Sequence, residues 1–121
     1  MEVKKSFKKL ESYKHSKAID VLKSWFEPEF ICTLDHKFFA GEVLLFVPDL
    51  TLFEDGTVRA IYEVVHKHGL TGKKLGMIQF WSSLNYDFPV YEVNADWILD
   101  QTGKPDIIQA DKFYTDTLIT V

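Results

Sequence analysis

The chain has 121 residues, 46% of them hydrophobic, which is enough for one compact domain with a core and too short for two, so we predict a single domain over residues 1–121. The formal net charge of −4 argues against nucleic-acid binding over the whole surface, because such domains carry a basic excess. The lysines are nevertheless concentrated, with seven in the first 23 residues. They indicate a solvated helix face or, alternatively, a phosphate-binding edge.

Cysteine usage and hydropathy indicate the compartment. Cys32 is the single cysteine, so an intramolecular disulfide is impossible, which suits a reducing cytoplasm. The lysine-rich start has no apolar run behind it, and no run of about 18 apolar residues occurs anywhere. We expect a cytoplasmic protein without a membrane partner, and whether it forms a homodimer stays open.

The first predicted element is a helix over about residues 7–26, which ends before Pro28. Its apolar stripe has spacings of three and four and consists of Leu10, Ala18, Val21, Leu22 and Trp25. Strand-like runs follow at 29–34 and 41–47, and then at 49–53 and 58–65. The last two are joined through Asp55-Gly56, a strong hairpin signal because both central turn positions favour positive φ.

The second half of the chain contributes a helix and one or two strands. Residues 70–85 have helical spacing, 89–99 are predicted to be a strand that starts at Pro89, and 113–121 would add an edge strand. The order is thus helix, meander of strands, helix, strand. A helix between 60–65 and 90–93 allows those two strands to pair in parallel. The fold class is therefore α/β, with a mixed central sheet that has helices on both faces.

Two carboxylates on the hairpin need an explanation. With the turn at Asp55-Gly56, Asp49 falls opposite Tyr62, one residue from Glu63, and a bulge or one-residue register change would bring the two acids side by side. Adjacent carboxylates repel each other, and a divalent cation relieves that repulsion. Oxygen-only ligands suit Mg²⁺ or Mn²⁺.

The first helix carries two further polar residues, Glu11 and His15, on the stripe that should face the sheet. One interpretation is that they reach the same site as the two carboxylates. The other is that they lie at the exposed end of the helix and hydrogen-bond nearby backbone.

These residues resemble the PD-(D/E)XK nucleases, which have the restriction-endonuclease-like fold. The likeness consists of Pro48-Asp49, the hairpin that follows, Glu63 as the second acid and Glu11 on the first helix. Segments 10–26, 48–68 and 74–99 look most like the small bacterial and phage branch, in which apolar residues and a histidine follow the second acid. The resemblance covers about residues 7–99, and its motifs are short.

The resemblance implies a metal-dependent nuclease acting on DNA or, less well supported, on RNA. Asp49, Glu63 and the backbone carbonyl of Val64 would hold Mg²⁺ or Mn²⁺, which activates the attacking water. Glu11 would hold an outer-shell water or a second ion. His15 or His68 would position the substrate or transfer a proton.

One position departs from the family pattern. A lysine normally stands two residues after the second acid, and this chain has Val65 there. Lys67 lies on the same strand face, farther along, and is our preferred substitute over Lys73 and Lys74 at the start of the next helix. Two alternatives therefore remain: a catalytically inactive nuclease-fold module that binds nucleic acid or a protein partner, and an unrelated α/β domain whose acids are ordinary hairpin residues.

Two minor interpretations concern histidines and aromatic residues. His66 and His68 share a strand face and could form a zinc site with His15 or His36. Phe38 and Phe39, beside Lys37, are the best aromatic candidates for a partner contact, while spacing assigns most other aromatic residues to the core.

Overall fold

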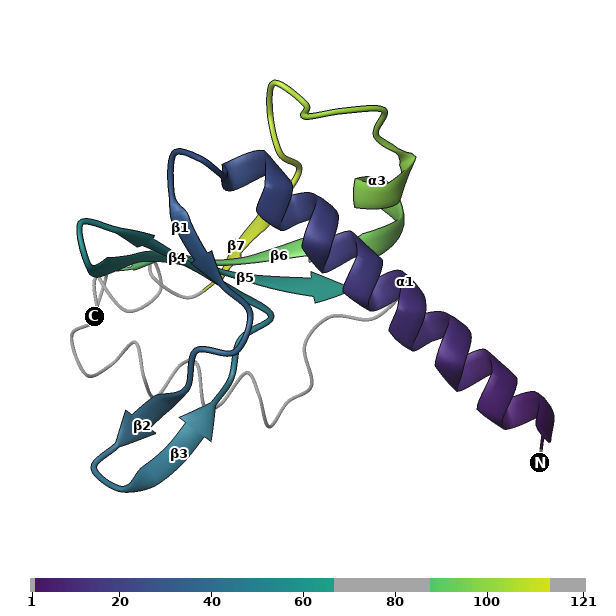
Figure 1. Ribbon diagram of the computed structural model, residues 1–121, viewed down its shortest axis with the longest axis horizontal. Coiled ribbons are helices and arrows are strands. Elements are labelled where there is room, and N and C mark those ends of the chain that lie inside the picture. The colour runs from purple at the N-terminus through teal and green to yellow at the C-terminus, as the bar shows by residue number, and fades with distance from the viewer. Residues whose placement is uncertain (1, 67–87, 114–121) are drawn as a thin grey trace.

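The computed structural model has a mixed α/β fold in which one long helix crosses a face of a five-stranded sheet (Figure 1). It describes residues 2–66 and 88–113, without the side chains of 2–12, 40, 45 and 111–113. The elements are α1 (Glu2–Phe26), β1 (Ile31–Thr33), β2 (Phe38–Ala40), β3 (Val43–Phe46), β4 (Leu50–Glu54), β5 (Thr57–Val65), β6 (Val90–Asn94), α3 (Ala95–Asp100) and β7 (Asp111–Phe113).

The main sheet has the strand order β1-β4-β5-β6-β7. Strands β1, β4 and β5 are antiparallel neighbours, β5 and β6 are parallel, and β7 is antiparallel to β6. The parallel pair confirms the arrangement predicted for 60–65 and 90–93. The predicted meander is wrong in one respect, because β3 pairs with β2 in a separate two-stranded sheet.

The hairpin between β4 and β5 has the turn that its sequence predicts. Asp55 and Gly56 have φ values of 53° and 79°, the left-handed conformation that this tight turn requires. The register then shifts between Leu52 and Phe53, so that Leu50 pairs with Tyr62. The residue before Leu50, Asp49, is thereby brought opposite Glu63, as the alternative with a bulge predicts.

Two element boundaries differ from the prediction. Helix α1 begins at Glu2, earlier than residue 7. The predicted strand 89–99 ends at Asn94, and α3 follows it directly. Asn94 causes this change, because its Oδ1 accepts a hydrogen bond from the Trp97 N–H at 3.1 Å and so caps the first turn of α3.

Predictions for the remaining segments are only partly covered. Strand β7 overlaps the edge strand expected at 113–121 at Phe113 alone, and the rest of that range lies outside the described residues. The helix expected at 70–85 lies outside the described residues.

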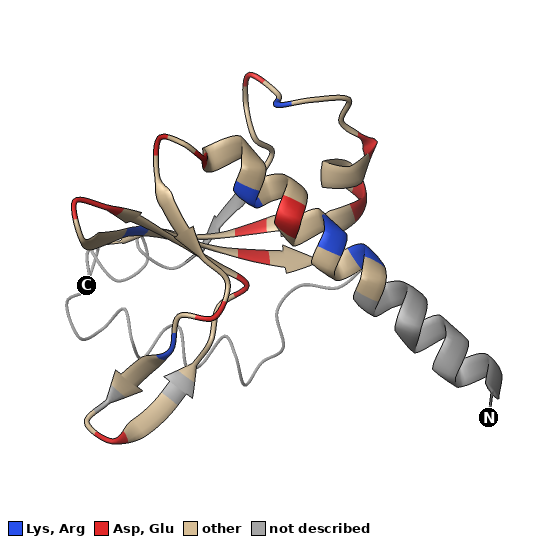
Figure 2. Ribbon diagram, viewed as in Figure 1, with Lys and Arg blue, Asp and Glu red and all other residues tan. Residues whose placement is uncertain are grey.

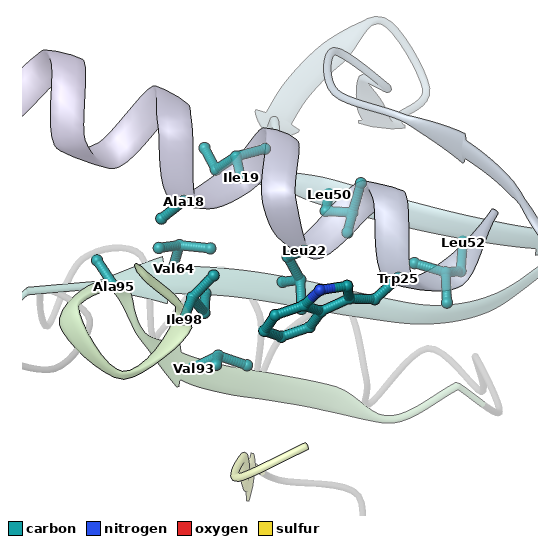
Figure 3. Packing of buried hydrophobic residues seen from close by; sticks show 10 residues of the cluster. All are labelled: Ala18, Ile19, Leu22, Trp25, Leu50, Leu52, Val64, Val93, Ala95 and Ile98. Carbon is teal, nitrogen blue, oxygen red and sulfur yellow. The ribbon is translucent and has the colours of Figure 1, made fainter. Parts of the chain in front are cut away.

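The hydrophobic core lies between the sheet and the two helices α1 and α3, which cover the same face (Figure 3). Trp25 of α1 meets Trp97 of α3 edge-on, with ring centroids 6.0 Å apart. Burial of such side chains is the main favourable term in folding. The cluster consists of Ala18, Ile19, Leu22, Trp25, Leu50, Leu52, Val64, Val93, Ala95 and Ile98.

The opposite face of the sheet is also buried. Thr51, Ile61, Glu63 and Val90 are at most 1% exposed, and the register pairs Thr51 with Ile61 and Ile61 with Val90. Glu63 therefore lies on the sheet face opposite α1. Among the described helices, none is long and apolar enough to cross a membrane.

Candidate functional site

Two hydrogen bonds connect Asp49 with Glu63 and with its neighbour on β5. Asp49 immediately precedes β4, and its N–H donates to Glu63 Oε1 at 3.3 Å. In return, the N–H of Val64 on β5 donates to Asp49 Oδ2 at 2.8 Å. These reciprocal bonds fix both carboxylates near the carboxyl end of β5, where the ladder between β4 and β5 ends.

His15 of α1 joins the same group. Its Nε2 lies 3.2 Å from Asp49 Oδ2 and 3.0 Å from the carbonyl oxygen of Val64. Both partners are acceptors here, so Nε2 carries the proton and donates to them. His15 therefore contacts both a carboxylate and the backbone at this place.

The three side chains of this group differ in their exposure to solvent. Glu63 is 1% exposed, whereas the side chains of Asp49 and His15 are 17% and 32% exposed. Burying a carboxylate costs free energy unless partners compensate it. A diffusing ion or substrate would therefore meet Asp49 and His15 first, with Glu63 behind them.

The register places further carboxylates on the neighbouring strands. Glu63 pairs with Glu92 of β6, and Glu92 pairs with Asp111 of β7. Glu63, Glu92 and Asp111 thus form one row of acidic residues across β5, β6 and β7, and Asp49, just before β4, continues it. We did not predict this row, because the pairing of β6 with β7 could not be derived from the sequence.

The donor set suits a hard divalent cation. Asp49 Oδ2 and the Val64 carbonyl oxygen converge on one atom, His15 Nε2, so a cation near that position would meet both oxygens. No group of three or more His, Cys, Asp or Glu side chains in the described part of the chain is arranged to hold a metal ion.

The other predicted site residues are only partly covered by the structure. Glu11 lies on α1 about one turn before His15, and its side chain is not described. Lys67, His68 and Lys74 lie outside the described residues. Val65, at the usual lysine position, is half-buried and pairs with Asn94.

His66 and Asn94 join the end of β5 to β6. The His66 ring lies 5.5 Å from that of His15, measured between centroids. Asn94 Nδ2 donates to the His66 carbonyl at 2.7 Å, besides capping α3. The cap signal was present in the sequence as an Asn before a short apolar run. His36, the alternative third zinc ligand, instead packs edge-on against Phe38 and Phe53.

The two phenylalanines proposed for a partner contact differ in environment. Phe38 is 4% exposed and stacks on Phe46 with centroids 5.1 Å apart. It belongs to the packed interior, so its assignment to a partner contact is wrong. Phe39 is 47% exposed on the separate hairpin and stays a candidate.

Comparison with known proteins gives no further guide, because no family model, no curated protein and no solved structure matches the chain.

Proposed function

We propose that the chain is a Mg²⁺- or Mn²⁺-dependent nuclease that hydrolyses phosphodiester bonds in DNA. The observation that carries this proposal is the pairing of Asp49 with Glu63, reinforced by reciprocal backbone hydrogen bonds at 3.3 and 2.8 Å. A structural hairpin has no need of two acids at this place, one of them almost fully buried.

The topology supports a restriction-endonuclease-like fold, which is part of the same proposal. A helix precedes an antiparallel hairpin, and the second hairpin strand pairs in parallel with the next strand of the sheet. The two acids lie on that hairpin, at the end where β5 leaves the sheet. Order and acid placement agree with the family that the sequence resembles.

The residues of the site would have distinct roles in cation binding and proton placement. Asp49, Glu63 and the Val64 carbonyl would hold the cation, which when bound lowers the pKa of a water and offsets charge on the phosphate. Val64 N–H orients the Asp49 carboxylate. His15 Nε2 holds a proton at Asp49 Oδ2, and it would give up that contact, or share it, when a cation binds.

A calorimetric Mn²⁺ titration, run beside a nuclease assay, tests the proposal. Asp49→Ala and Glu63→Ala should each abolish Mn²⁺ binding and cleavage while the domain stays folded by circular dichroism. Glu54→Ala is the matched control, since it removes an exposed acid from the same hairpin, whose Oε1 lies 3.9 Å from Arg59 Nε. Unchanged Mn²⁺ affinity in both site variants would end the proposal.

A second candidate is an inactive nuclease-fold module that binds nucleic acid. The specific observation in its favour is Val65, a half-buried apolar residue at the place of the usual lysine. Nucleic-acid binding without cleavage in Mg²⁺ or Mn²⁺ would establish this candidate and exclude the first.

A further inference from the structure

The N-terminal half of α1 extends away from the rest of the fold, starting at the candidate site. Figure 1 shows it running beyond the end of β5. Tyr13, Lys14, Ser16 and Lys17 are exposed, and the described core residues of α1 begin at Ala18. His15 is therefore the place where this helix leaves the sheet, and its imidazole contacts Asp49. We call residues 2–14 the arm.

The charge of the chain is distributed unequally between its first 23 residues, which include the arm, and the remaining residues. The first 23 residues hold seven lysines and three carboxylates, a net charge of +4, while the other residues hold the remaining seven of 14 basic and 15 of 18 acidic residues, a net charge of −8. On the described part of α1, Lys14, Lys17 and Lys23 stand beside Asp20, and Figure 2 shows mostly acidic residues, with some basic ones, over the sheet, its loops and α3. A polyanion approaching Asp49 is repelled by most of the surface and attracted along α1.

Helical geometry selects two lysines of the arm. At about 100° per residue, positions 4 and 8 fall within about 20° of His15 around the helix axis. By spacing alone these two positions share a helix face with His15, and positions 5 and 9 fall about 80–120° away. Positions 8 and 4 are about 10 and 16 Å from His15 along the axis.

We propose that the arm is a binding track for the DNA backbone, on which Lys8 and Lys4 contact phosphates flanking the one that reaches Asp49. Each strand of B-DNA presents one phosphate per about 3.4 Å of axis, so two lysines about 6 Å apart reach different phosphates of the same strand. This inference rests on the proposed function for the identity of the ligand. It adds the surface and the residues that recognise it.

The test is equilibrium binding of a short fluorescein-labelled DNA duplex to the full chain in EDTA, by anisotropy over a range of NaCl concentrations. Lys4→Ala/Lys8→Ala should weaken binding and reduce the slope of log K against log salt by about 2. Lys5→Ala/Lys9→Ala is the matched control, because it removes the same charge at nearly the same distance from His15. The control should reduce the slope by less than half as much.

Equal effects of the two pairs would overturn the track, since they would reflect net charge alone. It would also be overturned if the wild type bound phosphatidylserine–phosphatidylcholine vesicles through Lys4 and Lys8 but bound no DNA. Because EDTA removes any cation, the binding experiment tests the track independently of the proposed nuclease activity, and either proposal can be contradicted without the other. DNA binding that depends on Lys4 and Lys8 without cleavage in Mn²⁺ upholds the track and contradicts the nuclease, and cleavage with binding indifferent to these lysines does the reverse.

Discussion

Asp49 donates its backbone N–H to the Glu63 carboxylate at 3.3 Å, across the end of the β4–β5 hairpin. This bond exists because the strand register shifts by one residue between Leu52 and Phe53. Without the shift, Asp49 would lie opposite Tyr62 instead of Glu63. The bulge is thus the feature that assembles the acid pair.

Replacing Glu63 with glutamine should separate the effect of its buried charge on stability from its role in binding a cation. Glu63→Gln keeps the shape of the side chain and removes a charge beside Asp49, so we expect a melting temperature in EDTA no lower than that of the wild type. Mn²⁺ should raise the melting temperature of the wild type, by the equivalent of about 2.7 kcal/mol at 100 times the dissociation constant. Thermal unfolding with and without Mn²⁺ measures both effects, and an equal Mn²⁺ shift in the variant would contradict the assignment of Glu63 as a ligand.

Asn94 should contribute to stability through both ends of its amide. Its Oδ1 caps α3 and its Nδ2 donates to the His66 carbonyl. Asn94→Ala loses both bonds and should lower the free energy of unfolding by about 1–2 kcal/mol. Asn94→Asp keeps the cap and loses only the donor, so urea unfolding should show a smaller loss. Equal losses would mean that the cap contributes nothing.

The sequence was informative where local chemistry decides the structure. Asp55-Gly56 predicted the hairpin because few residues tolerate the required φ, and helical spacing put His15 on the stripe that faces the sheet. The position of the bulge at Leu52 and Phe53 was not predictable, since neither residue has a special backbone preference. The register, and with it the acid pair, could be offered only as an alternative.

The remaining misses have a common physical origin in short apolar runs. Residues 89–99 fit a continuous strand as well as a strand followed by a helix, and only the Asn94 cap distinguishes the two. Residues 43–47 are apolar whichever sheet they join, so their pairing with β2 could not be derived. Tertiary contacts decide between secondary structures or strand pairings that the local sequence fits equally well.

Tyr62 should make the protein sensitive to alkaline pH. Burial, and next the neighbouring Tyr91, raise the pKa of Tyr62 from its ordinary 10 to about 12. The Tyr62 ring stacks on Tyr91 and lies at a tilt to Phe26. Between pH 10 and about 12 the unfolded chain loses this proton while the folded chain keeps it. Stability is therefore fully present below pH 10 and falls as the pH rises through this window.

Tyr62→Phe removes that titration and should flatten the decline. Urea unfolding across the alkaline range, with tyrosinate absorbance recorded in parallel, compares the two proteins. A wild type whose stability falls no faster than that of Tyr62→Phe would refute the role of Tyr62.

Catalysis should depend on a lysine that replaces the missing one. Val65 is two residues beyond Glu63 on β5, hence on the same strand face, and it is half-buried. We expect cleavage to be weak and Lys67→Ala to reduce it by about 10² to 10³, because Lys67 continues that face by sequence spacing. Val65→Lys should raise cleavage by supplying an ammonium group next to Glu63. Val65→Met introduces a side chain similar in length to lysine but uncharged, and it should not raise cleavage. Initial rates on labelled DNA in Mg²⁺ and Mn²⁺ give the comparison.

Strong cleavage that survives both Lys67→Ala and Lys74→Ala would show that no substitute lysine is used. The attacking water would then have to be oriented by His15, the histidine in contact with Asp49.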